Sequence, residues 1–324
     1  LVDLPRGKVT PYLGDCCISG QGVSGKTHIV MTDNGFRNKH FVSTSWELVS
    51  EKMVEYKCRG GSVNQLLGFD IHGKKIQSHK DKFGQPPTIM HDEGSMTNVR
   101  LMNKIKEMYP YSQLIVMGDY DKGKYYQSSV LTNGDKLYHP LSYHMIDADY
   151  RSVDEETRQF KLQIRNRMDR DESLIGYLHE MIPTVTMDEL KKEYSMDYVM
   201  TGVKDRIWNT FNPLLTSDKN WYKVTKHTMD DVIKKCSGQE AYLHGEVLDF
   251  PIEGRTEIAH ASTVHSFQGK TIPVHKKCFV DLSYLRCNQD IYTAISRVRS
   301  IHQLRIIKSD FPSVIYSNGM YNYQ

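Results

Sequence analysis

The chain has 324 residues, of which 39% are hydrophobic and 25% are charged, and its formal net charge is +3. This composition is typical of a globular protein and excludes a membrane protein, because no apolar run approaches the ~20 residues that span a bilayer. At roughly 100–200 residues per domain, the length predicts two domains. The near-neutral charge allows a polyanionic partner only where basic residues cluster locally.

The six cysteines do not form a metal-binding pattern, because no two of them are spaced as Cys-x-x-Cys and Cys16 directly precedes Cys17. In a chain of this length they are expected to be reduced, mostly buried thiols of an intracellular protein. Residues 1–8 also lack the layout of a signal peptide. Cytoplasm, nucleus and a viral replication site within a host cell all remain open.

Strand-length apolar runs alternate with amphipathic helical patterns in the first half of the chain. The runs are residues 40–44, 88–91 and 113–117, and the helical patterns are residues 46–56 and 98–108. This alternation predicts an α/β fold with a parallel sheet covered by helices. Such sheets place ligands at the carboxyl ends of their strands.

The sequence changes character near residue 150. Ser152-Val-Asp-Glu155 reads as a capping box that starts a helix ending near Arg170, and the α/β pattern then resumes. We therefore predict two domains, residues 1–145 and 146–324. Residues 69–87, which are polar and Lys-rich, are expected to form an exposed hairpin or loop inserted in the first domain. Residues 216–257 are expected to be a small insertion in the second.

Residues 20–27 read Gly-Gln-Gly-Val-Ser-Gly-Lys-Thr, a complete P-loop pattern. In this pattern glycines let backbone N–H groups wrap around a phosphate. Lys26 would reach the β- and γ-phosphates and Thr27 would coordinate Mg²⁺. A Gly-rich surface turn is the alternative. The predicted nucleotide cradle consists of Gly20, Gly22, Ser24, Gly25, Lys26 and Thr27.

Carboxylates follow two of the predicted strands. Asp92-Glu93 comes directly after the run 88–91, where Asp92 could hold Mg²⁺ through water and Glu93 could orient the attacking water as general base. Asp119 ends a second run and could sense the γ-phosphate. The alternatives are an ordinary acidic helix start for the pair and a strand-to-turn residue for Asp119.

Arg151 lies at the predicted domain boundary, and Arg297 lies in the segment Ile-Tyr-Thr-Ala-Ile-Ser-Arg, where we expect the start of a helix. A guanidinium supplied by a second domain can neutralise the charge that develops on a transferring phosphoryl group. Taken alone, each arginine is better explained as a surface or ion-paired residue.

These segments, in this order, resemble a superfamily 1 helicase. The match extends over residues 14–308, and its short spacers and the Gln268-Gly269 form of motif V favour the RecD-like branch, superfamily 1B. Compact cores of this kind also occur in viral replication proteins, so a viral source is an open hypothesis. The matching segments are 20–27 (motif I), 43–46 (Ia), 62–69 (a RecD-like segment), 92–96 (II), 118–119 (III), 150–152 (IV), 263–271 (V) and 292–297 (VI).

The resemblance implies two RecA-like P-loop domains that sandwich ATP and Mg²⁺. Lys26, Glu93, Arg151 and Arg297 would be catalytic, and Thr27 and Asp92 would hold the metal. Tyr150 would stack on adenine, and Gln268 and Gly269 would also belong to the nucleotide site. The residues expected to contact nucleic acid are Ser43, Thr44, Trp46, Asn64 and His265.

The sequence departs from the family pattern in motif III, where Lys122 occupies the slot that usually holds Gln. Either Gln127 substitutes after a shift, or Lys122 itself contacts a phosphate or a nucleic-acid strand directly. Lys270 follows motif V where relatives carry an acidic or small residue. Trp46 has a second interpretation, as a packed helix residue. The lysines of residues 74–82 read as a strand-separating pin or as a solvated loop.

The expected function is that of an ATP-dependent nucleic-acid helicase or translocase, with DNA as substrate and 5′–3′ polarity taken from the resemblance. Its expected partners are single-stranded nucleic acid, duplex junctions and other replication proteins, with no membrane. Three alternatives stay open: a viral-type RNA helicase, a P-loop ATPase that remodels protein partners, and a small-molecule P-loop kinase. A kinase would need no second domain that carries Arg151 and Arg297.

Overall fold

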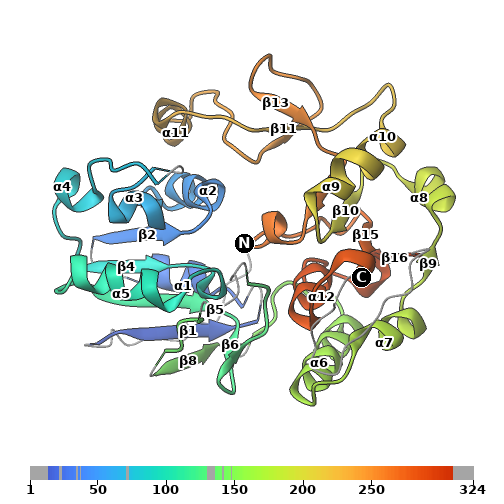
Figure 1. The fold of residues 1–324 in the computed structure, drawn as a ribbon, viewed down its shortest axis with the longest axis horizontal. Helices are drawn as coiled ribbons and strands as arrows, with labels where there is room; N and C mark the ends of the chain where they lie inside the picture. Colours follow the sequence, from blue (N-terminus) through green and yellow to red (C-terminus); the bar gives the residue numbers. More distant parts are fainter. Residues whose placement is uncertain are drawn as a thin grey trace. The chain divides into compact units, whose positions relative to one another are not determined.

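Two parallel sheets organise the chain, each in its own unit of the computed structural model (Figure 1). The structure describes residues 14–21, 24–33, 36, 38–70, 73–129, 136–140, 142–146 and 148–308. The first unit comprises Leu1–Lys124, Val130–Ala148 and His227–His244, and the second comprises Tyr125–Ser129, Asp149–Lys226 and Gly245–Gln324. The predicted division at residue 145 stays a prediction.

The first unit contains a six-stranded sheet in which all neighbouring strands are parallel. In sheet order the strands are β3 (Arg59–Ser62), β2 (Lys39–Ser43), β4 (Thr88–His91), β5 (Gln113–Gly118), β1 (Cys16–Gly20) and β8 (Tyr143–Ile146). A short hairpin, β6 (Tyr120–Asp121) and β7 (Lys124–Tyr125), follows β5. The helices of this unit are α1 (Lys26–Thr32), α2 (Trp46–Tyr56), α3 (Val63–Leu67), α4 (His79–Phe83), η1 (Gly94–Met96), α5 (Val99–Met108) and α11 (Met229–Cys236).

Successive residues of the central strands enter two different cores, because side chains alternate across a sheet. On β2, Phe41 packs into one core with residues of α1 and α2, whereas Val42 packs into the other with residues of α3 and α5. On β5, Ile115 and Val116 divide in the same way. Helices therefore cover both faces, which explains why these strands read as continuous apolar runs.

The second unit contains a five-stranded parallel sheet and a small antiparallel one. The larger sheet has the order β14 (Ala261–Thr263), β10 (Tyr198–Thr201), β15 (Cys278–Asp281), β16 (Leu304–Ile307) and β9 (Thr184–Val185), and the smaller one β12 (Val247–Leu248), β11 (Tyr222–Val224) and β13 (Thr256–Ile258). Its helices are α6 (Glu155–Asp169), α7 (Leu174–Met181), α8 (Met187–Glu193), α9 (Lys204–Arg206), η2 (Ile207–Phe211), α10 (Asn212–Leu215), η3 (His265–Phe267), η4 (Leu282–Tyr284), α12 (Asn288–Ile295) and η5 (Ile301–Gln303).

The predicted α/β fold with two parallel-sheet domains is confirmed, and two local predictions are wrong. The N-cap of α6 is Asp154, whose carboxylate accepts a hydrogen bond from the Thr157 N–H at 2.7 Å, and not Ser152. Within residues 69–87 the chain forms the helix α4, whose capping box joins Ser78 and Asp81, and not only an exposed hairpin or loop. Within the described part of the chain, no helix is both long and apolar enough to cross a membrane.

Candidate nucleotide site

The turn between β1 and α1 has the backbone that the P-loop pattern requires. Gly25 adopts a φ of 74°, a left-handed conformation that favours glycine. A Cβ on Gly20 would lie 2.2 Å from the Ser24 hydroxyl oxygen and 2.9 Å from the Ile146 carbonyl oxygen, so only glycine fits there. Gly22 lies outside the described residues. The loop is therefore closed tightly against the end of β1.

Two side chains of this loop fit a phosphate. The Lys26 ammonium is buried and donates hydrogen bonds to the carbonyl oxygens of Gly20 at 3.1 Å and Gln21 at 3.2 Å. The Ser24 hydroxyl is also buried and, among the described residues, has no hydrogen-bond partner. A buried polar group without a partner costs free energy. A phosphate oxygen would satisfy this hydroxyl, and its charge would be balanced by Lys26.

Thr27, in the first turn of α1, and Asp92, directly after β4, lie together although they are far apart in the sequence. The Thr27 hydroxyl donates to the Asp92 carboxylate at 3.0 Å, and the other oxygen of that carboxylate accepts from the Glu93 N–H at 2.9 Å. Hydroxyl and carboxylate oxygens are ligands that Mg²⁺ takes together with substrate phosphates and water. In the described residues, no group of three His, Cys, Asp or Glu side chains could hold a metal ion. The pair therefore fits Mg²⁺ bound jointly by protein and phosphate.

Glu93 and Asp119 complete the carboxyl edge of this sheet. Glu93 is half-buried, and its φ of 56° places it in a conformation that a non-glycine residue adopts at some energetic cost. Asp119 follows β5 and is buried. Because Ser19 on β1 is paired with Gly118 on β5, Asp119 lies beside the start of the P-loop. The predicted catalytic and metal-binding residues of the first unit thus share one edge.

The two predicted arginines meet inside the second unit. Arg151 is 2% exposed and Arg297 is 1% exposed. The Arg151 guanidinium donates to the Ser296 carbonyl oxygen, and the Arg297 guanidinium donates to the Ser296 hydroxyl at 2.8 Å and to the Thr293 carbonyl at 2.9 Å. Arg297 follows the end of α12 and not, as expected, the start of a helix, and its guanidinium bonds to the same residue, Ser296, as that of Arg151.

The remaining residues predicted for the nucleotide site also lie in the second unit. Tyr150 is exposed, Gly269 has a φ of 83°, and the buried Gln268 amide donates to the Gln127 side chain at 3.2 Å. Lys122 lies at the exposed tip of the β6–β7 hairpin, where positive φ angles at Lys122 and Gly123 are typical of a type I′ turn. Gln127 contacts Gln268 of motif V, whereas Lys122 lies at an exposed turn. The structure thus favours Gln127 over Lys122 as the substitute for the glutamine that motif III usually holds.

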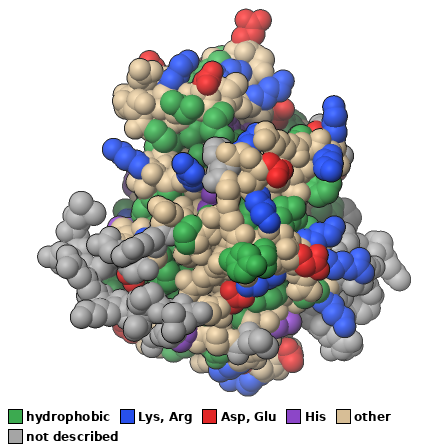
Figure 2. All heavy atoms as spheres, turned by 90° about the vertical axis from the view of Figure 1, so that its left-hand side faces the viewer, with side chains coloured by type: hydrophobic (Ala, Val, Ile, Leu, Met, Phe, Trp, Pro, Cys, Tyr) green, Lys and Arg blue, Asp and Glu red, His purple; other side chains and the backbone are tan. Residues whose placement is uncertain are grey.

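Three of the five candidate nucleic-acid contacts lie at adjacent strand ends. Ser43 is paired with Ser62 across β2 and β3, so exposed Thr44 and exposed Asn64 follow neighbouring strands. The Ser43 hydroxyl is buried and has no hydrogen-bond partner in the part of the chain that the structure describes. On the face shown in Figure 2, Lys and Arg side chains are scattered among apolar and acidic ones.

Trp46 and His265 have partners within their own units. The Trp46 ring is partly buried against the first core and stacks on the His227 ring, with centroids 5.5 Å apart and planes 7° from parallel. The His265 Nε2 lies 2.7 Å from the Ser128 hydroxyl and 2.8 Å from the Arg286 guanidinium. Burial lowers the pKa of His265, and Asp290 opposes this shift. Both side chains are therefore held in place by the protein.

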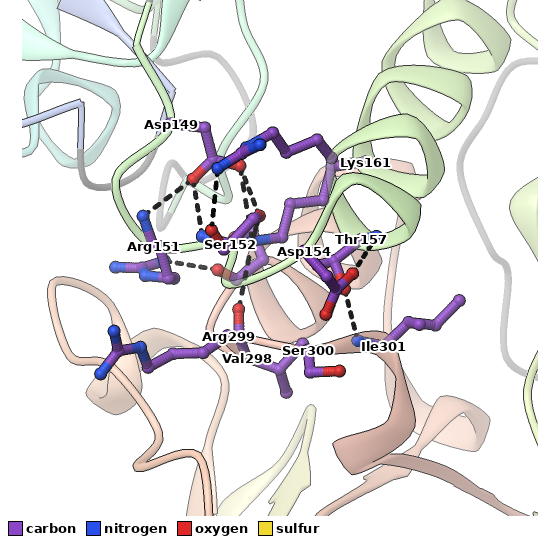
Figure 3. A network of polar contacts seen from close by, with 12 residues as sticks. Asp149, Arg151, Ser152, Asp154, Thr157, Lys161, Val298, Arg299, Ser300 and Ile301 are labelled. Carbon is purple, nitrogen blue, oxygen red and sulfur yellow. Dashed lines mark hydrogen bonds and ion pairs between the residues drawn. The ribbon is translucent and has the colours of Figure 1, made fainter.

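Among the described residues, two buried cations of α6, Lys161 and Arg165, were not predicted. Lys161 donates to Ser152 and to the Val298 carbonyl (Figure 3), and Arg151 and Arg297 are close enough to lower its pKa. A lysine within a helix belongs to no local motif, and only the tertiary fold reveals its neighbours. The sole sequence signal is its place one residue after the apolar Phe160.

The sequence matches no protein-family model and no curated protein. Its fold is similar to solved structures of Pif1 helicases. A Bacteroides Pif1 bound to single-stranded DNA has a TM-score of 0.63 at 12% identity, over 91% of this chain and 88% of that one. Bacteroides Pif1 with ADP-AlF3 and single-stranded DNA has a TM-score of 0.59 at 13% identity, over 92% and 89%. Candida albicans Pif1 also has a TM-score of 0.59 at 13% identity, over 92% and 91%. The chain therefore has the fold of Pif1 helicases, which confirms the superfamily 1B resemblance at the level of the fold.

Proposed function

We propose that this chain is an ATP-dependent DNA helicase or translocase that moves 5′–3′ along single-stranded DNA. The observation that carries the proposal is the P-loop arrangement, in which buried Lys26, the buried Ser24 hydroxyl and the Thr27–Asp92 pair meet at one sheet edge. It occurs in a chain with the fold of Pif1 helicases, and solved Pif1 structures contain single-stranded DNA and ADP-AlF3. An intracellular location and other replication proteins as partners remain predictions.

Each residue has a separate role in this proposal. Lys26 and Ser24 bind the phosphates, and Thr27 and Asp92 hold Mg²⁺, which neutralises phosphate charge when bound. Glu93 orients the attacking water and accepts its proton. Arg151 and Arg297 compensate the charge that develops on the transferring phosphoryl group. These roles require the guanidinium groups of Arg151 and Arg297 to reach the nucleotide that the first unit binds.

Single-stranded nucleic acid should stimulate the ATPase. The test is the rate of ATP hydrolysis alone, with single-stranded DNA, and with single-stranded RNA of the same sequence. We expect DNA to raise kcat, because a translocase couples hydrolysis to movement along its strand. Stimulation by RNA alone would favour the RNA-helicase alternative. A rate that neither strand changes would contradict the proposal and favour an ATPase that acts on proteins.

A further inference from the structure

Lys161 joins the two segments that carry the arginines. Its side chain is buried, with the amine inside the second unit and the residue near the middle of α6. Neighbouring Phe160 and Ile164 pack into the main core of that unit, so the helix holds the lysine at a fixed position. Figure 3 shows the lysine extending from α6 to the turn that contains Ser152.

On one side Lys161 contacts the Arg151 segment. Its amine donates to the Ser152 hydroxyl at 2.9 Å and lies 3.9 Å from the Asp149 carboxylate. That carboxylate accepts hydrogen bonds from the backbone N–H groups of Arg151 at 2.9 Å and Ser152 at 3.0 Å. The lysine and Asp149 together therefore fix the turn from which the Arg151 side chain extends.

On the other side Lys161 contacts the Arg297 segment. The same amine donates to the carbonyl oxygen of Val298, the residue after Arg297, at 3.1 Å. A backbone hydrogen bond from the Val153 N–H to the Arg299 carbonyl, at 2.9 Å, joins the same two segments. Since Arg151 and Arg297 both bond to Ser296, a shift of either segment would change the position of both guanidinium groups.

We propose that Lys161 is a positioning residue for the ATPase reaction, holding Arg151 and Arg297 in register through its bonds to Ser152 and Val298. The inference rests on the proposed function, because the arginines matter only where phosphate charge develops. Lys161, Arg151 and Arg297 share this interior with the carboxylates of Asp149 and Asp154, and burying several cations together costs free energy in the folded state. This free-energy cost follows from holding the guanidinium groups of Arg151 and Arg297 next to each other.

The charge of Lys161 is sensitive to pH. Burial lowers the pKa of the amine to about 8, Asp149 and Asp154 oppose the shift, and Arg151 and Arg297 add to it. The amine is thus charged below about pH 8 and becomes neutral above it. A neutral amine still forms hydrogen bonds but attracts Asp149 less, which loosens the turn that carries Arg151.

The test compares DNA-stimulated ATP hydrolysis by Lys161→Met, Lys161→Arg and Arg165→Met. Arg165 is a matched control, because it is a buried cation one turn further along α6 and stacks on Tyr126, 3.8 Å from the ring centroid. We expect Lys161→Met to lower kcat by on the order of 10²-fold, the effect of misplacing a catalytic group by about 1 Å, with an unchanged KM for ATP. Arg165→Met should keep kcat, and Lys161→Arg should restore most of it.

If Lys161→Met does not fold, as judged by circular dichroism, the pH dependence of kcat decides the question. Wild-type kcat should fall as the pH rises through 8, and Lys161→Arg should show no such fall, because a guanidinium stays charged. An identical alkaline fall in both proteins, or a folded Lys161→Met variant with wild-type kcat, would overturn the inference. A wild-type protein without ATPase activity would instead overturn the proposed function.

Discussion

At the scale of single residues, the P-loop is the part of the molecule that the sequence specifies most completely. Each position follows from a local requirement: Gly20 and Gly25 from backbone geometry, Lys26 from charge, and Thr27 from its hydroxyl. These requirements act within a few neighbouring residues, so the spacing alone predicts the site. The contact between Thr27 and Asp92 depends on the sheet order, in which β5 lies between β1, which precedes the P-loop, and β4, which precedes Asp92.

Replacing Lys26 with Ala should abolish ATP hydrolysis and leave the fold intact. The ammonium is the cation of the predicted phosphate site, and its hydrogen bonds are to loop carbonyls rather than to the core. The measurement is ATP turnover together with thermal unfolding. Lys104→Ala, which changes an exposed lysine of α5, is the control and should behave as the wild type. Retained turnover in Lys26→Ala would remove the P-loop assignment.

Gly20→Ala should weaken ATP binding, because the new Cβ would lie 2.2 Å from the Ser24 hydroxyl and would displace the loop. The control is Gly176→Ala on α7, where a Cβ meets no atom within 4 Å. That substitution should stabilise the helix by about 0.5–1 kcal/mol and leave ATP binding unchanged. Calorimetric titration with ATP would measure the dissociation constant of each variant and so distinguish the effect of Gly20→Ala from that of Gly176→Ala. Equal affinity in both variants would show that the tight loop is not the nucleotide site.

At the scale of elements, periodicity predicted the long and buried segments and failed on short ones. The strand at 88–91 and the helix at 46–56 match β4 and α2 residue for residue, because continuous burial and a 3.6-residue repeat are local signals. Helix α4 has five residues in a polar stretch, and only its capping box marks it. The N-cap of α6 was misplaced because Ser152 and Asp154 both suit that role, and Ser152 instead bonds to Asp149 and Lys161.

The first unit should lose stability in mild acid because its sheet buries neutral histidines. His40 on β2 and His79 on α4 share a 2.9 Å hydrogen bond, and burial lowers their pKa values to about 3 and about 4. The unfolded chain takes up protons below its ordinary histidine pKa of 6.5, whereas the folded state does not. The free energy of unfolding should therefore fall as the pH drops from about 6.5 to about 4.

Denaturant titrations of the wild type and His79→Gln at pH 7 and pH 4.5 would measure this effect. A variant with one fewer buried histidine should lose less stability between the two pH values. The control is His179→Gln, which changes a histidine at an exposed position of α7. An acid-induced loss that is the same in all three proteins would assign the effect to other groups.

At the scale of the whole molecule, the sequence predicted two parallel-sheet units but not how short segments divide between them. Residues 125–129 group with the second unit and residues 227–244 with the first, although both are contiguous in sequence with the other unit. Ser128 bonds to Thr293 and His265, and α11 packs against α2. Contacts of this kind join residues far apart in the chain, so no local pattern reveals them.

Replacing Arg297 with Ala should lower kcat by on the order of 10³-fold while ATP still binds, because the P-loop belongs to the first unit and the arginine to the second. Arg299→Ala, two residues away and half-buried, is the control and should keep most of the activity. Thermal unfolding must show that removing the buried guanidinium leaves the second unit folded. A folded variant with unchanged kcat would exclude the proposed role.

The most direct test of the whole account is ATP-dependent unwinding of duplex DNA that carries a single-stranded tail, measured by strand separation. We predict that the wild type separates a 5′-tailed duplex with ATP, that a 3′-tailed duplex remains paired, and that Lys26→Ala separates neither. Active ATP hydrolysis with no separation of either tailed duplex, and no displacement of a protein block from single-stranded DNA, would contradict the claim that this chain is a DNA motor.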